Sequence, residues 1–211
     1  MKTSNKPIVQ NIVKQCKWHG IRHIVFSPGS RNAPFAIAFD NDPYFKTHII
    51  HDERVAGFYA LGIAQVLNEA VAVCCTSGSA VVNYFPAITE AFYRKIPLLV
   101  ISADRPKNLI NKGHGQTIMQ DSIFGSHIKT SQSFEDVNIL STNSIENCVS
   151  KMESLYQNPK GPIHFNVHLE EPLYETSMAD EEVNHKNIDV VDDQSEPLSK
   201  IIKIIDGKKT I

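Results

Sequence analysis

The chain has 211 residues, of which 42% are apolar and 21% are charged, and its formal net charge is −2 at pH 7. This is the composition of an ordinary soluble chain, long enough for one domain of typical size and an appendage. The slightly negative charge argues against a general nucleic-acid binder, which would show a basic face. An anionic ligand would have to be bound by a few placed arginines.

Neither a signal peptide nor a membrane span is expected. Residues Met1–Gly20 carry apolar residues at helical spacing and no compact hydrophobic block. Residues Ala70–Thr89 are uncharged, but Thr76–Ser79 and Pro86 divide them into a strand, a turn and a helix. The cysteines show no metal-ligand spacing, which favours reduced thiols and a cytoplasmic location. They are Cys16, Cys74, Cys75 and Cys148.

Strands and helices alternate along most of the chain. The predicted elements in chain order are a helix over Lys6–His19, a strand over Arg22–Phe26, a helix over Asn32–Phe39, a strand over Thr47–Ile50, a helix over Arg54–Glu69, a strand over Val71–Cys75, a helix ending near Tyr93, a strand over Pro97–Ala103, a loop over Lys107–Gly125, a strand over Ile128–Phe134, a helix over Ser144–Tyr156 and a strand over Pro162–Leu169. Continuous apolar strands that alternate with amphipathic helices indicate an α/β fold with a doubly wound, mostly parallel sheet and helices on both faces.

Three parts are predicted along the chain. Residues 1–171 form the α/β domain, and residues 172–196 form a linker that is acidic and polar with little periodicity. Residues 197–211 start a truncated further domain, because a short helical pattern is followed by the turn Asp206-Gly-Lys-Lys and an isolated apolar end.

The segment Ser27-Pro-Gly-Ser-Arg31 follows a predicted strand and opens a helix. Pro28 and Gly29 favour a tight turn, and Ser30 is a candidate cap for the helix that follows. Free amides at the helix start, together with the forked Arg31 side chain, favour a carboxylate or a phosphate. The alternative is a well-capped loop with a surface arginine.

Asp52-Glu53-Arg54 follows the next strand, at the sheet edge where open α/β folds bind ligands. Three consecutive charges are often a solvated helix start. The apolar residues that follow at once indicate that at least one of these charges points into packed structure, and Glu53 is our candidate.

Two further strand ends carry polar residues. Thr76-Ser-Gly-Ser-Ala80 lacks the glycine spacing of a nucleophile elbow and the Gly-Lys-Ser/Thr of a phosphate loop, which leaves a structural turn or a turn whose amides face a ligand. Asp104-Arg-Pro106 places Arg105 on the same predicted edge as Arg31 and Glu53.

Taken in order, these motifs resemble one family. They are Ser27-Pro-Gly-Ser-Arg31, Asp52-Glu-Arg54 with Ala56-Gly-Phe58, Cys75-Thr-Ser-Gly-Ser79, Ala103-Asp-Arg-Pro106 and Gly113-x-x-Gln116. Over Ile8–Leu169 the chain resembles the N-terminal, pyrimidine-binding domain of 2-succinyl-5-enolpyruvyl-6-hydroxy-3-cyclohexene-1-carboxylate synthase, the thiamine-diphosphate enzyme of menaquinone biosynthesis. Val55 and Gly115 depart from the residues expected there, a serine and an asparagine.

The resemblance implies a role for each candidate residue. Glu53 would be the catalytic carboxylate, which hydrogen-bonds N1′ of the thiamine pyrimidine and so helps to remove the C2 proton. Ser77 and Gly78 would be further cofactor contacts. The implied substrates are 2-oxoglutarate, which is decarboxylated, and isochorismate, which receives the succinyl unit. The implied substrate-binding residues are Ser30, Arg31, Arg105 and Gln116.

The resemblance also implies what lies elsewhere. Thiamine enzymes hold the diphosphate and Mg²⁺ through Gly-Asp-Gly and a later asparagine, which this chain lacks, so no metal ligand is assigned here and the Mg²⁺ would belong to a missing C-terminal domain. The implied protein is a homo-oligomer, and this stretch alone would be inactive. Two alternatives remain, namely another thiamine-dependent decarboxylase or carboligase, and a non-catalytic α/β module for anion binding or dimerisation.

Overall fold

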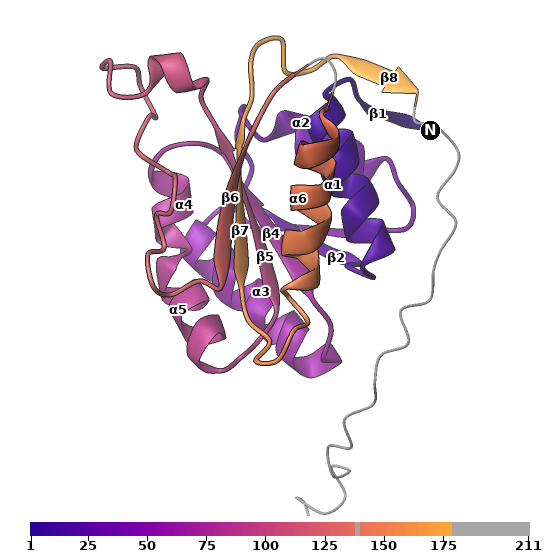
Figure 1. Ribbon diagram of the computed structural model, residues 1–211, viewed down its shortest axis with the longest axis vertical. Helices are drawn as coiled ribbons and strands as arrows, with labels where there is room; N and C mark the ends of the chain where they lie inside the picture. The colour runs from indigo at the N-terminus through magenta and orange to yellow at the C-terminus, as the bar shows by residue number, and fades with distance from the viewer. Residues whose placement is uncertain (138–139, 179–211) are drawn as a thin grey trace, which may run out of the picture.

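A computed structural model describes residues 1–137 and 140–178, and its centre is a six-stranded, wholly parallel sheet (Figure 1). The strand order is β3-β2-β4-β5-β7-β6. These strands are β2 (His23–Phe26), β3 (Lys46–Ile49), β4 (Val71–Cys75), β5 (Leu98–Asp104), β6 (Thr130–Glu135) and β7 (Ile163–His168). The predicted parallel α/β sheet is confirmed.

Helices cover both faces of the sheet. They are α1 (Pro7–Trp18), α2 (Ala33–Asp40), α3 (Glu53–Leu67), α4 (Ser79–Asn83), α5 (Phe85–Tyr93) and α6 (Thr142–Glu153). One apolar core lies between the sheet and α1, α2 and α6, and a second lies between the sheet and α3, α4 and α5 (Figure 1). Cys74 belongs to the first core and Cys75 to the second, because successive side chains of a strand point to opposite faces.

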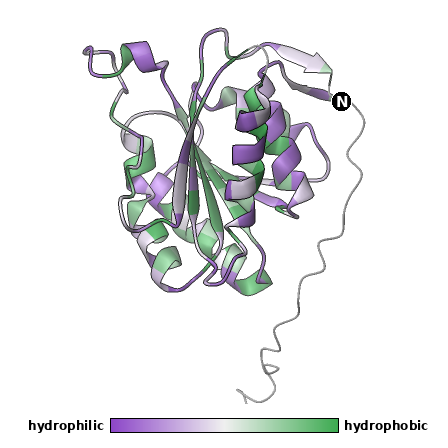
Figure 2. Ribbon diagram, viewed as in Figure 1, coloured by the Kyte–Doolittle hydropathy of each residue, from purple (hydrophilic) through white to green (hydrophobic). Residues whose placement is uncertain are grey.

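The strands differ in how apolar they are, as Figure 2 shows. All five residues of β4 and all seven of β5 are buried, as expected for central strands covered on both faces. The outer strand β6 has the sequence Thr-Ser-Gln-Ser-Phe-Glu and buries only Phe134. The core therefore lies around β2, β4, β5 and β7.

The chain reverses its winding between β2 and β4. Strand β2 pairs with β3 on one side and with β4 on the other, with Val25 opposite both His48 and Val73. The chain leaves β2 for α2 on one face and leaves β4 for α4 on the other face. The chain therefore leaves these two neighbouring strands toward opposite faces of the sheet, and such a topological switch point is where doubly wound sheets bind ligands.

One predicted helix is divided in the structure. The sequence predicts a continuous helix up to Tyr93, but α4 ends at Asn83 and α5 begins at Phe85. Pro86 explains the break, because it has no N–H for the Val82 carbonyl and its ring clashes with that carbonyl.

A small second sheet joins the N-terminus to the start of the predicted linker. Strand β1 (Lys2–Ser4) pairs antiparallel with β8 (Thr176–Met178), with Thr3 opposite Ser177. The sequence predicts no strand in either segment, because each is too short to show alternation. The division at residue 171 stays a prediction, and the rest of the linker and residues 197–211 lie outside the described residues. Within the described ranges, no helix is long and apolar enough to cross a membrane.

Candidate functional site

The loop after β2 is held by its own asparagine and by the loop after β4. Asn32 Oδ1 accepts the Gly29 N–H at 3.0 Å, and Asn32 Nδ2 donates to the Ser27 carbonyl at 2.9 Å. A Cβ on Gly29 would lie 2.5 Å from Thr76 Cβ, so the two loops touch at the switch point. The predicted helix cap at Ser30 is wrong. Asn32 is the capping residue, and Ser30 is exposed and contributes its carbonyl to the Ala33 N–H.

Arg31 is buried behind this loop, with 6% of its surface exposed. Its Nη1 donates to the Leu169 carbonyl at 3.0 Å, and its Nη2 lies 2.9 Å from Glu171 Oε1, while the buried Nε has no partner among the described residues. Burial, and then the charge of Arg105, lower the pKa of Arg31, and Glu171 acts in the opposite direction. The guanidinium is thus already paired with one mostly exposed carboxylate.

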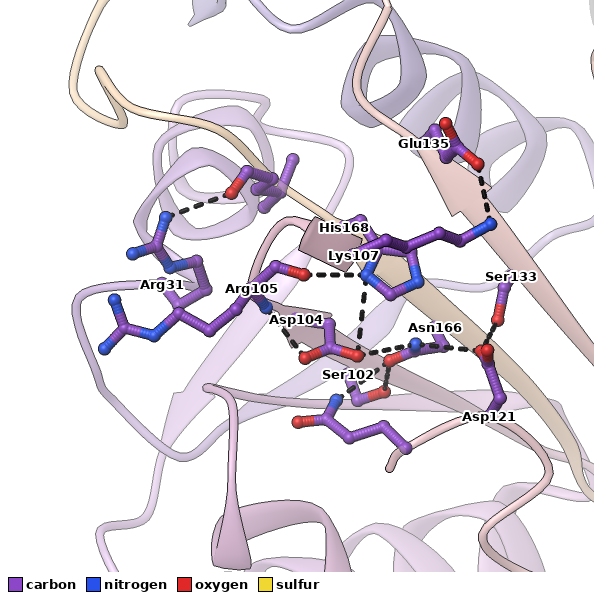
Figure 3. Close-up of polar contacts among 12 residues, drawn as sticks. Arg31, Ser102, Asp104, Arg105, Lys107, Asp121, Ser133, Glu135, Asn166 and His168 are labelled. Atoms are coloured by element: carbon purple, nitrogen blue, oxygen red, sulfur yellow. Dashed lines mark hydrogen bonds and ion pairs between the residues drawn. The ribbon is translucent and has the colours of Figure 1, made fainter. Parts of the chain in front are cut away.

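Arg105 lies beside Arg31, and Figure 3 shows the two guanidinium groups side by side. Its backbone is clamped on both sides: the Arg105 N–H donates to Asp104 Oδ1 at 2.7 Å, and the Arg105 carbonyl accepts from His168 Nδ1 at 2.7 Å. The buried Arg105 Nε has no partner within the described part of the chain. Two forked cations with unused donors suit a dicarboxylate.

Glu53 is the first residue of α3. Asp52 caps this helix by accepting the N–H groups of Arg54 at 2.9 Å and Val55 at 3.3 Å, and Asp52 also pairs with the exposed Arg54 side chain. Glu53 is half-buried and, among the residues that the structure describes, has neither a hydrogen bond nor an ion pair. The prediction that one of the three charges turns toward packed structure is confirmed for Glu53.

Two buried groups show where the Glu53 carboxylate lies. Burial raises the pKa values of the Cys75 thiol and the Tyr84 phenol, and the nearby Glu53 charge adds a smaller contribution in the same direction. Tyr84 donates from its hydroxyl to Ser27 Oγ at 3.0 Å. Glu53 therefore lies at the α3 side of the switch point, against the ends of β2 and β4.

The turn after β4 contains the remaining candidates. Ser77 is 2% exposed and its Oγ has no partner among the described residues. Gly78 has φ +83°, which favours glycine, and a Cβ there would lie 3.1 Å from the Gln116 Cα. The Gln116 side chain is exposed. The structure thus brings Gly78 and Gln116 together, and Arg31 and Arg105 together, at one edge of the sheet.

Several buried polar residues here are given no role in the site by the sequence analysis. They are Ser102, Asp104, Gln120, His164, Asn166 and His168, all at most 3% exposed. Burial raises the pKa of the Asp104 carboxyl, although the Asn166 hydrogen bond and His168 act in the opposite direction. A signal exists in β7, where His164, Asn166 and His168 alternate with apolar residues and mark one polar face of an otherwise buried strand.

The comparison with protein families identifies the family of this chain. The model described as "Thiamine pyrophosphate enzyme, N-terminal TPP binding domain" matches residues 8–124, more than half of the chain. The chain belongs to this thiamine pyrophosphate enzyme family. The matched segment contains all seven candidate residues.

Individual relatives give a finer similarity. The chain is 49% identical over 197 residues to the 2-succinyl-5-enolpyruvyl-6-hydroxy-3-cyclohexene-1-carboxylate synthase of Flavobacterium psychrophilum, covering 92% of this chain and 34% of that protein. It is 41% identical over 177 residues to the synthase of the same name from Porphyromonas gingivalis, covering 82% and 31%. The chain therefore spans about a third of the length of these curated relatives.

A solved structure shares the fold of this thiamine pyrophosphate enzyme domain. It is the thiamine diphosphate-dependent 4-hydroxybenzoylformate decarboxylase of Rhodococcus jostii RHA1, with a TM-score of 0.64 and 20% sequence identity, covering 76% of this chain and 30% of that one. At this identity the likeness shows the fold alone.

Proposed function

We propose that this chain forms the pyrimidine-binding part of a 2-succinyl-5-enolpyruvyl-6-hydroxy-3-cyclohexene-1-carboxylate synthase of menaquinone biosynthesis. That enzyme would decarboxylate 2-oxoglutarate with thiamine diphosphate and transfer the succinyl unit to isochorismate. The observation that carries the proposal is a half-buried glutamate, unpaired within the described residues, and a pair of arginines at one edge of the sheet. The relatives named above support the choice of reaction.

The cofactor residues fit a thiamine pyrimidine. Among the described residues, Glu53 is left without a donor although the adjacent Asp52 is fully paired, so Glu53 is available to the ring nitrogen N1′. The buried Ser77 Oγ, which has no partner in the same ranges, offers one more hydrogen bond. When bound, thiamine diphosphate supplies the electron sink for the decarboxylation. With the cofactor bound, Glu53 would hold the hydrogen bond to the pyrimidine nitrogen N1′ and take part in proton transfer at that atom.

The substrate residues fit carboxylates. The planar, forked guanidinium groups of Arg31 and Arg105 match planar carboxylates. Glu171 occupies one side of Arg31, and we infer that a substrate carboxylate displaces it. Ser30 and Gln116 are exposed beside these groups and are proposed as further substrate contacts.

Three further features belong to the proposal. The described residues contain no group of three or more His, Cys, Asp or Glu side chains that suits a metal ion, and we assign the Mg²⁺ to residues outside this chain. Helices α3 and α4 expose Val55 (54%), Phe58 (48%), Val66 (83%) and Val82 (45%), and we infer that another subunit of a homo-oligomer covers this face. The free cysteines support a cytoplasmic location.

The test uses the complete polypeptide that contains these 211 residues. When 2-oxoglutarate, isochorismate, thiamine diphosphate and Mg²⁺ are supplied, we expect isochorismate to be consumed and CO₂ to be released. CO₂ release that leaves isochorismate unchanged would point to another thiamine-dependent decarboxylase. No turnover with either substrate would favour the alternative of a non-catalytic α/β module for anion binding or dimerisation.

A matched pair of variants tests the role of Glu53. Glu53→Gln keeps the shape of the side chain but removes the carboxylate, so we expect turnover to fall by at least about a hundredfold while the melting temperature stays unchanged. Asp52→Asn, which alters the neighbouring exposed helix cap, should keep most of the activity. Normal turnover by Glu53→Gln would exclude Glu53 from the chemistry.

A further inference from the structure

A continuous hydrogen-bond chain joins the turn at Gly78 to the turn at Arg105. The Gly78 N–H donates to Gln120 Oε1 at 2.8 Å, and Gln120 Nε2 donates to Asn166 Oδ1 at 2.8 Å. Asn166 Nδ2 donates to Asp104 Oδ2 at 2.9 Å, and Asp104 Oδ1 accepts the Arg105 N–H at 2.7 Å. Figure 3 shows the part of this chain from Asn166 to Arg105. The proposed cofactor turn and the proposed carboxylate-binding arginine are thus connected.

The side chains of this relay are fully buried. Gln120, Asn166 and Asp104 each have 0% exposure. Burying polar groups costs free energy unless each is hydrogen-bonded, and apolar side chains of similar size would fill the same space without that requirement. The relay therefore calls for a reason other than filling the core.

The Asn166 amide can take only one orientation. Its oxygen accepts from Gln120 Nε2 and from Ser102 Oγ at 2.8 Å each, and its nitrogen donates to Asp104 and, at 3.3 Å, to Asp121 Oδ1. All four hydrogen-bonding positions of the amide are used. Turning the amide over would place its oxygen against two carboxylates. Asn166 consequently orients Gln120, whose oxygen then faces Gly78.

The relay holds main chain and leaves functional side chains open. The Arg105 carbonyl is held by His168 Nδ1 at 2.7 Å, whereas the Arg105 Nε has no partner among the described residues. Gly78 has a glycine-type backbone and precedes α4, so its N–H depends on Gln120. The relay therefore fixes the backbone at Gly78 and Arg105, while the Arg105 side chain keeps a donor for a ligand.

We propose that Gln120 and Asn166 are positioning residues, which set the separation between the cofactor turn at Gly78 and the substrate-binding Arg105. The inference rests on the proposed function, which assigns the cofactor to the turn at Gly78 and the substrate to Arg105. Neither side chain needs to touch a ligand. Their loss should nevertheless weaken cofactor and substrate binding together, because one rigid relay holds both turns.

Three variants of the complete enzyme test this coupling. Asn166→Ala and Gln120→Met each remove the relay. We expect each to raise two constants by about tenfold, the effect of one buried hydrogen bond, namely the Kd for thiamine diphosphate and the KM for the substrate 2-oxoglutarate. Gln120→Glu keeps an acceptor for Gly78 but turns an oxygen toward Asn166. It should restore the cofactor Kd toward the wild-type value while the substrate KM stays high. A change in only one constant in both Asn166→Ala and Gln120→Met would overturn the proposal.

A control separates positioning from general loss of stability. Met152 is fully buried in α6, in the core on the face of the sheet that Phe165 and Val167 line, whereas Asn166 points to the opposite face. Met152→Ala leaves a cavity in that core. It should lower the melting temperature but leave the Kd and KM unchanged. If Met152→Ala raised both constants as much as the relay variants do, the effect would be one of stability and the proposal would fail. If Asn166→Ala does not fold, the Kd and KM values of the two Gln120 variants test the proposal.

Amide hydrogen exchange gives a readout that needs no activity. In Gln120→Met the Gly78 and Arg105 amides should both exchange about tenfold faster than in the wild type, while amides of α6 should not change. If the wild-type enzyme had no synthase activity but Gln120→Met showed this exchange pattern, the proposed function would be refuted and the coupling between the two turns supported. An active enzyme whose Arg105 amide exchanges at the wild-type rate in Gln120→Met would refute the coupling.

Discussion

His164 lies within β7, and its ring is fully buried. Its Nε2 lies 2.7 Å from Ser102 Oγ, and its Nδ1 lies 3.0 Å from Ser131 Oγ. Because Ser102 donates its own hydrogen to Asn166, its oxygen accepts from Nε2, so Ser131 must donate to Nδ1. Burial accordingly lowers the pKa of His164 from 6.5 to about 3.

The lowered pKa makes His164 a source of acid sensitivity. In the unfolded chain the ring is exposed and has its ordinary pKa, so between about pH 6.5 and pH 3 the unfolded state binds a proton that the native state does not. The contribution to stability is complete above the unfolded pKa and is lost as the pH falls. At about 1.4 kcal/mol per pH unit, lowering the pH from about 7 to about 4.5 should remove about 2–3 kcal/mol through this residue alone.

Urea unfolding at neutral pH and at about pH 4.5 measures this effect. His164→Phe starts about 1–3 kcal/mol less stable, since two hydrogen bonds are lost. Its stability should nevertheless fall by about 2–3 kcal/mol less than that of the wild type between the two pH values, because all other groups titrate equally in both chains. The exposed control His114→Phe should follow the wild type. Equal losses in wild type and His164→Phe would refute a neutral buried ring.

Three further predictions concern the site and the switch point. Arg105→Ala should lower kcat/KM for the substrates by about a hundredfold or more, because it removes a charged hydrogen-bond donor; unchanged kinetics would remove this residue from the site. Glu171→Gln should lower the substrate KM by about two- to fivefold, since a partly exposed ion pair with Arg31 is worth about 1 kcal/mol or less; a raised KM would show that Glu171 helps to bind substrate instead. In thermal unfolding, Gly29→Ala should destabilise the chain by about 1–3 kcal/mol, because its methyl group would lie 2.5 Å from the Thr76 side chain. Gly62→Ala in α3 would meet no described atom within 4 Å, so it should be neutral or stabilising. Equal melting temperatures for the two glycine variants would contradict the close packing of the two loops.

The order of strands and helices was predictable from local pattern. Runs such as Val71–Cys75 and Leu98–Asp104 are apolar almost without interruption, and such runs separated by amphipathic helices indicate a parallel sheet. Two local features were misjudged. The break between α4 and α5 follows from Pro86, which the sequence displays. Strands β1 and β8 have three residues each, too few to show periodicity, and they pair only when the two ends of the domain are brought together.

The candidate site was predictable only in part. Motif order pointed to Arg31, Arg105 and Glu53, and the structure brings the two arginines together. The pairing of Arg31 with Glu171 was not expected, because these residues are distant in sequence and meet only when β7 is placed beside β5. Gln120 was missed for the same reason, since nothing in a polar loop shows that one of its amides is buried.

The sequence by itself determined the class of fold, the strand ends that carry charge and the family resemblance, because hydrophobic periodicity and short motifs are local properties of the chain. Only the tertiary structure decided which strand ends are neighbours and which polar side chains are removed from water. Those properties depend on the order β3-β2-β4-β5-β7-β6. This order brings Asn166 of β7 beside Asp104 of β5 and leaves Glu53 without a partner among the described residues.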